Sequence, residues 1–263
     1  VNASKKDWRS IRGHKIGYIP QSALAGPNPV MRIGAQLAEA VTQRGRKSKD
    51  EVRRRSLELL ELVQIRRPEV VLKQYPYELS GGMKQRVMIA CAIAKNPKLI
   101  VADEPTTALD VTVQKEVLNL ISQLVAEDGM GLLLISHDLG LMRDQVDRVM
   151  VMYGGSVVES APTQNLFQHR RHPYTQGLFA ARPQLGLKRG TRLTTIPGQV
   201  PDLLNWPTAC AFADRCAHVE AACRDALPPL SQASISSDFA NSNHSDTSHW
   251  VRCVKWQSIE SQT

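Results

Sequence analysis

Long hydrophobic runs are missing from this sequence. Among its 263 residues no apolar stretch approaches the roughly 18 to 20 residues of a membrane-spanning helix. The first residues, Val1–Asp7, carry charges without an apolar core behind them, so we expect no secretory signal in this segment. The first residue is Val rather than Met, and we expect the chain to begin inside a longer one. Aromatic residues are few, at 5 %, but a hydrophobic content of 42 % is ordinary for a globular core.

Acidic residues are in deficit only in the first third of the chain. Residues 1–78 contain 16 basic and 8 acidic side chains, whereas residues 79–263 contain 17 of each, so the whole net charge of +8 lies in the first part. The excess is concentrated at Arg44–Lys49 and Arg53–Arg55, where glutamates are interleaved at helical spacing. This pattern is typical of a solvated helix face. An acidic partner surface, such as lipid headgroups, is a second interpretation, and nucleic acid is a third that we do not adopt.

Cysteine is almost absent before residue 210. Four of the five cysteines fall in the last 54 residues: Cys210, Cys216, Cys223 and Cys253. Without a secretory signal, metal binding is a stronger expectation than disulfides. Four thiolates suit an iron–sulfur cluster or a zinc site, although the paired Cys-x2-Cys of most zinc ribbons is missing. Free or partly paired thiols are the third interpretation.

Strand and helix patterns alternate through the first 150 residues. Strands are predicted at Lys15–Ile19, Leu99–Ala102, Leu132–Ser136 and Asp147–Tyr153, and helices within residues 33–63 and at Ser80–Lys95 and Val111–Glu127. Pro68 is expected to close the helical stretch before it. This alternation predicts an α/β fold with a mainly parallel sheet. After about Val158 the pattern gives way to a proline-punctuated, irregular tail, in which Ser231–His249 is expected to be a loop.

Two acids follow the strand at Leu99–Ala102. Asp103 and Glu104 would lie at the carboxyl edge of a parallel sheet, where α/β folds bind ligands. Consecutive strand residues face opposite ways, so the chain must bend if both carboxylates serve one site. There Asp103 would hold Mg²⁺ through water, and Glu104 would polarise an attacking water as a general base.

A helix start and a histidine provide two further chemical signals. Ser80, Gly81 and Gly82 open a helix with exposed N–H groups, a site suited to phosphate, although an ordinary serine cap is the alternative. The strand at Leu132–Ile135 leads to His137, which would contact a γ-phosphate and orient the catalytic carboxylate. A purely structural histidine is the alternative there. Asp110 adds a carboxylate in the turn between the two strands.

These motifs resemble those of the ATP-binding-cassette (ABC) family in order and spacing. They match its glutamine loop, signature, Walker B motif, D-loop and histidine switch, at Gln21, Leu79–Arg86, Leu99–Glu104, Ala108–Asp110 and His137. The resemblance implies ATP and Mg²⁺ as cofactors. It implies catalytic roles for Glu104, His137 and Gln21, with Gln21 and Asp103 also at Mg²⁺. The implied nucleotide-binding residues are Ser80, Gly81, Gly82, Gln85, Asp103 and Asp110.

The resemblance also implies the domain organisation. Residues 1–160 would form part of a P-loop NTPase-like ABC ATPase core, with a mainly parallel sheet and an inserted helical subdomain, truncated at its N-terminus. Residues 161–263 would form an irregular, cysteine-containing C-terminal extension. The segments Met152–Gly155, His172–Thr175 and Ile196–Gly198 and the four late cysteines resemble oligopeptide and dipeptide importer ATPases. For those cysteines the resemblance suggests a [4Fe–4S] cluster.

One family motif does not occur. The sequence contains no Gly-x-x-x-x-Gly-Lys-Ser/Thr, the Walker A loop that would cradle the β- and γ-phosphates. In the family this loop precedes the glutamine loop, so we expect it to have been lost by truncation before Val1. A naturally degenerate subunit is the alternative. The 263 residues alone would then bind ATP weakly and hydrolyse almost none.

The function implied is that of the ATP-binding and hydrolysing subunit of a bacterial peptide importer. The implied partners are a second ABC ATPase subunit in a head-to-tail dimer, two integral membrane permease subunits and, indirectly, an extracytoplasmic substrate-binding protein. The chain would lie peripherally at the cytoplasmic face of the inner membrane. The alternatives are a non-catalytic scaffold that completes a partner's ATP site, and a cassette acting on ribosomes or in DNA repair.

Overall fold

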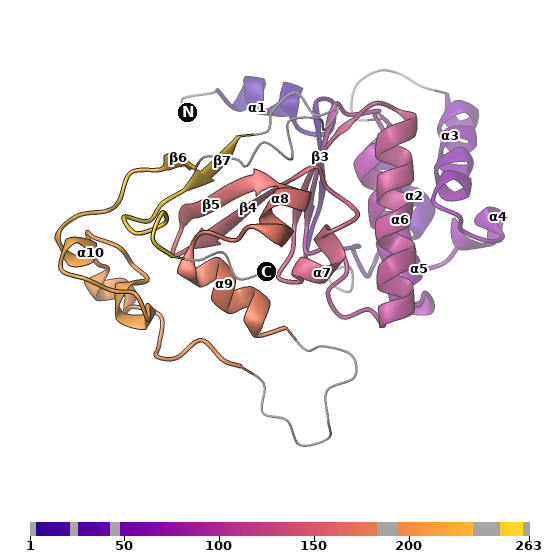
Figure 1. The fold of residues 1–263 in the computed structure, drawn as a ribbon. Helices are drawn as coiled ribbons and strands as arrows, with labels where there is room; N and C mark the ends of the chain where they lie inside the picture. Colours follow the sequence, from indigo (N-terminus) through magenta and orange to yellow (C-terminus); the bar gives the residue numbers. More distant parts are fainter. Residues whose placement is uncertain (1–3, 22–25, 43–47, 183–193, 234–247, 260–263) are drawn as a thin grey trace. The chain divides into compact units, whose positions relative to one another are not determined.

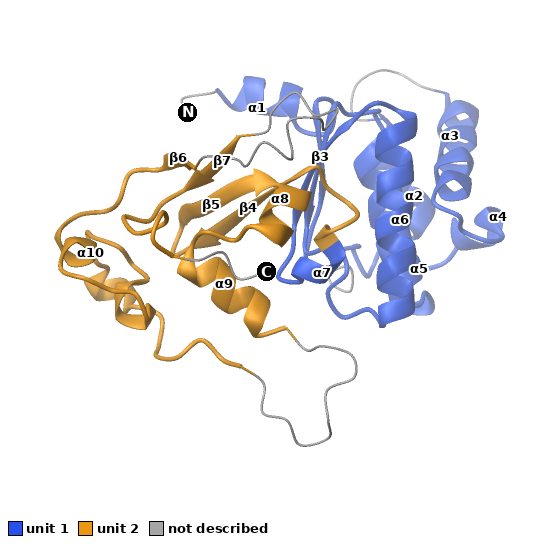
Figure 2. Ribbon diagram, in the orientation of Figure 1, with its two compact units in different colours: residues 1–141 blue, residues 142–263 orange. Residues whose placement is uncertain are grey.

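The structure is a computed structural model that describes residues 4–21, 26–42, 48–182, 194–233 and 248–259 (Figure 1). The chain forms two compact units, Val1–Leu141 and Met142–Thr263 (Figure 2). The sequence-based division was placed at residue 160 instead. Among the described residues, no helix is long and apolar enough to cross a membrane.

A three-stranded parallel sheet forms the centre of the first unit. Its strands β1 (Ile16–Ile19), β2 (Leu99–Asp103) and β3 (Gly131–Ile135) pair in that order, with Tyr18 opposite Val101 and Val101 opposite Leu133. All three strands were predicted from the sequence. The parallel pairing brings the carboxyl ends of β1, β2 and β3 to one edge, from which the candidate site residues follow.

The two faces of this sheet differ in burial. One face carries Ile19, Ile100, Ala102 and Leu134, all at most 9 % exposed. On this side β1 contacts helix α5 (Gly81–Ile93), and a Cβ at Gly17 would lie only 2.6 Å from the carbonyl oxygen of Ala92. The opposite face is open: Tyr18, Leu133 and Ile135 are 54 %, 41 % and 44 % exposed.

The first unit contains further helices beside α5. They are α1 (Lys5–Ile11), α2 (Ile33–Thr42), α3 (Lys49–Leu62), α4 (Pro68–Val71), α6 (Val111–Glu127) and α7 (Leu139–Met142), with a 3-10 turn at Pro76–Glu78. Helices α2, α3 and α5 pack together around Leu37, Leu59 and Ile89. The arrangement corresponds to the helical subdomain expected upstream of β2.

Two local expectations for this region need correction. The helical stretch predicted over residues 33–63 is two helices, and Ser48 begins the second with a capping box to Glu51. Residues 43–47 between them, which include the basic residues Arg44, Arg46 and Lys47, lie outside the described residues. Pro68 begins α4 rather than closing α3. Proline is tolerated at the first position of a helix, because the N–H group that it lacks would have no partner within the helix there. On α3, Arg54 and Arg55 both pair with Glu58, as a solvated helix face requires.

The second unit is built on an antiparallel sheet. Its strands are β4 (Arg148–Tyr153), β5 (Ser156–Pro162), β6 (Ser231–Ala233) and β7 (His249–Val251), in the order β4-β5-β7-β6. The strand predicted at Asp147–Tyr153 therefore exists, but it belongs to a hairpin and not to the parallel sheet. Gly154 and Gly155 make the hairpin turn with φ of 55° and 76°, which glycine adopts without a steric penalty.

The tail is more ordered than the prolines suggested. It contains α8 (Thr163–Gln168), α9 (Pro173–Ala180), α10 (Ala222–Asp225) and short 3-10 turns at Leu203–Asn205 and Ala213–Arg215. Pro173 begins a helix instead of interrupting structure. Ser231 and His249, the limits of the predicted polar loop, lie on β6 and β7, and residues 234–247 between them lie outside the described residues.

Candidate active site

The chain bends between Asp103 and Glu104. Strand β2 ends at Asp103, and Glu104 adopts a positive φ of 44° while its N–H donates to the carbonyl oxygen of Ile135 at 2.8 Å. A non-glycine residue in this region costs of order 1–3 kcal/mol, and such conformations concentrate at functional sites. Two consecutive acids can serve one site only if the chain bends between them, and the structure has this bend.

Three side chains contact the Glu104 carboxylate. His137 Nδ1 lies 3.1 Å from Oε1, and both Gln21 Nε2 and Thr107 Oγ1 donate to Oε2, at 2.8 and 2.9 Å. These contacts, first that of His137, then those of Thr107 and Gln21, hold the pKa of Glu104 below its usual value. The carboxylate is therefore ionised at neutral pH and fixed in orientation.

Two residues of this cluster were not singled out from the sequence. Thr107 follows Glu104 by three residues, and its backbone N–H also donates to the Glu104 carbonyl oxygen, so a turn places its hydroxyl back over the acid. That spacing was a usable signal. Tyr18 donates its hydroxyl to Asp103 Oδ2 at 3.1 Å, and Asp103 raises the pKa of Tyr18. The pairing of β1 with β2 creates this contact, so no local pattern could have revealed it.

A second group of predicted residues gathers where α5 and α6 begin. Ser80 Oγ accepts the N–H of Met83 at 3.3 Å, and Asp110 Oδ1 accepts that of Val113 at 3.0 Å. A Cβ at Gly82 would lie 2.9 Å from Val113, so this glycine allows the two helix starts to approach closely. The exposed Ser80 and the two glycines after it leave first-turn N–H groups available to an anion.

Gln85 differs from the other predicted binding residues. Its side chain is only 1 % exposed, and its Nε2 has no hydrogen-bond partner among the described residues. The structure therefore places it in the interior of the helical subdomain and not beside Ser80 at the surface.

The four late cysteines come together in the second unit. All four line one cavity of about 20 Å³, and the N–H of Cys210 donates to the carbonyl oxygen of Cys223 at 3.1 Å. They are free thiols, and burial raises the pKa of Cys253 to about 11 and also raises those of Cys210 and Cys216. Within the described parts of the chain, no three or more His, Cys, Asp or Glu side chains are arranged to hold a metal ion. In the described arrangement, therefore, the four thiols share a cavity without forming a metal-ligand set.

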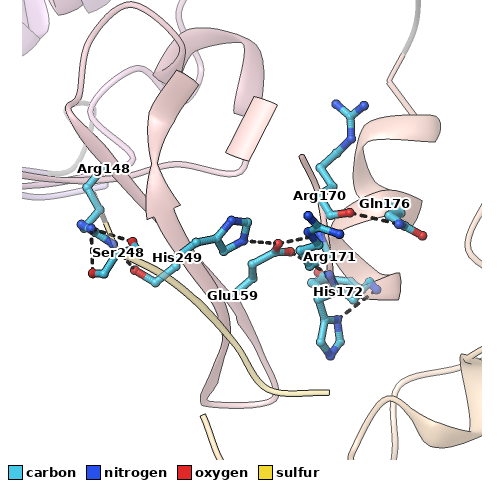
Figure 3. A network of polar contacts seen from close by, with 10 residues as sticks. Arg148, Glu159, Arg170, Arg171, His172, Gln176, Ser248 and His249 are labelled. Atoms are coloured by element: carbon cyan, nitrogen blue, oxygen red, sulfur yellow. Dashed lines mark hydrogen bonds and ion pairs between the residues drawn. The ribbon is translucent and has the colours of Figure 1, made fainter. Parts of the chain in front are cut away.

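A buried polar network fixes the segment that carries Cys253. Glu159 is fully buried, and its carboxylate accepts the N–H groups of Arg171 and His172 at 2.7 and 3.0 Å (Figure 3). The same carboxylate lies 2.8 Å from Nε2 of His249 on β7. Glu159 thus connects β5, the turn before α9 and β7. No local sequence pattern reveals this network, because its members are separated by up to 90 residues.

Comparisons with known proteins identify the family of this chain. Residues 1–107 match the ABC transporter family, and residues 158–223 match the C-terminal region of oligopeptide/dipeptide transporters. A protein of Brucella melitensis, described as a peptide import ATP-binding protein, is 44 % identical over 256 residues, which cover 95 % of this chain and 72 % of that protein. This chain belongs to the ABC transporter ATPases of oligopeptide/dipeptide importer type.

Other ABC proteins give the same result. The oligopeptide transport ATP-binding protein OppD of Bacillus subtilis is 44 % identical over 234 residues, covering 89 % of this chain and 65 % of OppD. The ATP-binding cassette MJ0796, solved as a dimer with ADP and phosphate bound, is similar in structure, with a TM-score of 0.55 and 30 % sequence identity. The match covers 62 % of this chain and 68 % of the MJ0796 chain.

Proposed function

We propose that this chain is the ATP-hydrolysing subunit of a bacterial peptide importer. The arrangement at Glu104 carries the proposal: an ionised carboxylate at the carboxyl end of β2, held by His137, Gln21 and Thr107. Such a carboxylate can orient a water molecule and polarise it for attack on a γ-phosphate. His137 is 75 % exposed, so one side of its ring remains available to the phosphate.

Asp103 and Gln21 are the residues that would hold Mg²⁺. Both offer side-chain oxygens, the donor type that this ion prefers, and both lie at the sheet edge beside Glu104. Bound there with ATP, the ion would neutralise charge on the phosphates. Asp103 already accepts a hydrogen bond from Tyr18, so its carboxylate orientation is set before any ligand arrives.

The signature residues are proposed to act on a partner's nucleotide. Ser80, Gly81 and Gly82 present N–H groups at the start of α5, away from the hydrogen bonds that hold Glu104. A head-to-tail dimer of two ABC ATPase subunits would place this helix start against the phosphates bound by the other subunit. The dimer would couple hydrolysis to two membrane permease subunits at the cytoplasmic face of the membrane, with a substrate-binding protein delivering peptide.

The proposal includes a phosphate loop outside these 263 residues. No Gly-x-x-x-x-Gly-Lys-Ser/Thr occurs in the sequence, and the sheet face bearing Tyr18, Leu133 and Ile135 is open. Apolar side chains of a central sheet are normally covered, which supports further polypeptide packing on this face. A polypeptide of the 263 residues alone would therefore hydrolyse almost no ATP.

The test restores the missing part. The strand, phosphate loop and following helix of OppD from Bacillus subtilis would be fused before Val1, and phosphate release would be measured for the fusion and for the 263 residues alone. We expect hydrolysis only in the fusion. A fusion that binds ATP but releases no phosphate would favour the alternative of a scaffold that completes a partner's site. Co-purification with ribosomes instead of permease subunits would contradict the transport assignment.

The proposal extends to an iron–sulfur cluster on Cys210, Cys216, Cys223 and Cys253. Its support is the convergence of four soft thiol donors on one cavity. Because the described side chains form no ligand set, the thiols would have to rotate toward one another on loading. Anaerobic purification, metal analysis and absorbance near 400 nm test this, with Cys216→Ser as the variant that bleaches the colour. Zinc without iron, or neither metal, would contradict the cluster.

A further inference from the structure

A larger cavity lies in the second unit, and none of its lining residues is among those proposed for ATP hydrolysis. Its volume is about 210 Å³. One wall is the β4–β5 hairpin, the facing wall is the segment 206–212, and Leu227, Pro228 and Arg252 complete the lining. At about 30 Å³ per water molecule, this volume has room for about seven waters, which is enough for a small organic ligand.

Aromatic rings make the apolar wall rigid. Tyr153 packs edge-to-face against Phe212, with ring centroids 5.2 Å apart, and both rings contact Tyr174. Trp206 covers the hairpin turn at Gly154, where any Cβ would collide with its indole ring. These rings hold one another in place, so the aromatic wall exists before any ligand binds.

Arg252 provides the one formal charge in the lining. Its Nε and Nη1 donate to the carbonyl oxygens of Val157 and Pro228, both at 2.9 Å, which orients the guanidinium and leaves further N–H donors on it. His172 and Cys210, the latter a proposed cluster ligand, also line the cavity. No Asp or Glu side chain is among the lining residues, all of which are described. The cavity therefore favours an anionic group at Arg252.

We propose that this cavity binds a small aromatic carboxylate, with the carboxylate on Arg252 and the ring against Tyr153, Trp206 and Phe212. A planar guanidinium matches a carboxylate with paired N–H donors, and an aromatic wall favours a ring over an aliphatic chain. The size, charge and shape of the site thus agree on one ligand class. The inference does not depend on ATP hydrolysis.

The test uses phenylacetate, which has ten non-hydrogen atoms, as the probe. Binding to the full chain would be measured by isothermal titration calorimetry and ligand-observed NMR, alongside the neutral isostere phenylacetamide and the cation phenethylamine. We expect one phenylacetate site, at least tenfold weaker binding of the amide, and no measurable binding of the amine. Failure of phenylacetate to bind at millimolar concentration, or equal binding of acid and amide, would overturn the proposal.

Variants locate the site. Ser156→Phe, at a half-buried position in the lining, fills the cavity, and Arg252→Met removes the charge; each is expected to weaken phenylacetate binding at least tenfold. Arg224→Met is the matched control, since Arg224 pairs with Asp214 and does not line the cavity. If circular dichroism shows that Arg252→Met does not fold, Ser156→Phe and the acid–amide comparison decide. Unchanged binding in a folded Ser156→Phe protein contradicts the assignment.

Discussion

The imidazole Nδ1 of His137 lies 3.1 Å from Oε1 of Glu104, although 33 positions separate the two residues in the sequence. Adjacent parallel strands make this possible, because β2 and β3 end at the same edge of the sheet. The other carboxylate oxygen accepts hydrogen bonds from Gln21, two residues after the end of β1, and from Thr107 in the turn after β2. Three strands therefore contribute to the environment of one acid.

Replacing Glu104 should stop the reaction without abolishing nucleotide binding. In the fusion that carries a phosphate loop, Glu104→Gln removes the charge that polarises water but keeps an amide of similar shape. We expect phosphate release to fall at least about a hundredfold, while ATP accumulates in a stable dimer detectable by size-exclusion chromatography. Glu127→Gln, at the last residue of α6 and before β3 rather than after it, has no contact with Glu104 among the described residues; it is the control and should behave as the parent. Rapid turnover by Glu104→Gln would contradict the role of Glu104.

Thr107 should act on Glu104 as a positioning residue. Thr107→Val removes one of the donors that lower the pKa of Glu104, so that pKa should rise and the acidic limb of the kcat profile should move to higher pH. We expect kcat to fall about tenfold with little change in KM for ATP. Thr107→Ser keeps the hydroxyl and should restore both rate and profile. A slower enzyme with an unshifted profile would indicate a merely structural role.

The hairpin glycines offer a matched stability test. Gly154→Ala introduces a Cβ at a positive φ and also drives it into Trp206, whereas Gly155→Ala meets nothing within 4 Å and bears only the conformational cost. We expect Gly154→Ala to lose about 2–4 kcal/mol of unfolding free energy and Gly155→Ala about 1 kcal/mol. Urea denaturation measures both. Equal losses would mean that Trp206 does not pack on this turn.

The stability of the second unit should depend on pH through His172. Its folded pKa is about 4, below the value of 6.5 for the unfolded chain, so below pH 6.5 the unfolded state binds the additional proton. The stabilisation that comes from keeping His172 neutral in the folded state is complete above pH 6.5. It is lost as the pH falls toward 4, at up to about 1.4 kcal/mol of unfolding free energy per pH unit. His172→Gln should flatten this dependence, and His218→Gln, at an exposed position, should not. Urea titrations between pH 4 and 7 provide the measurement.

Much of the first unit could be predicted because its signals are local. The helix start at Ser80, the strand at Leu99–Asp103 and the cap at Asp110 each depend on residues within one turn or one strand. The separation of α2 from α3 was missed, although Ser48 followed three residues later by Glu51 is the pattern of a capping box that begins a helix. In the second unit β5, α8 and α9 were also missed, since prolines at helix starts resemble loop signals.

The sequence by itself determined the chemistry available to this protein: an acid pair after a buried strand, a glycine-opened helix, a histidine after the next strand and four late cysteines. Only the tertiary structure decided which of these groups meet. Strand pairing brought Gln21, Glu104 and His137 together and joined Tyr18 to Asp103, while the helical packing buried Gln85. The cysteines converged on one cavity without forming a ligand set. Helix starts, strands and turns depend on residues that are close together in the sequence. Contacts between distant segments depend instead on the register of the strands and on the packing of helix and sheet faces.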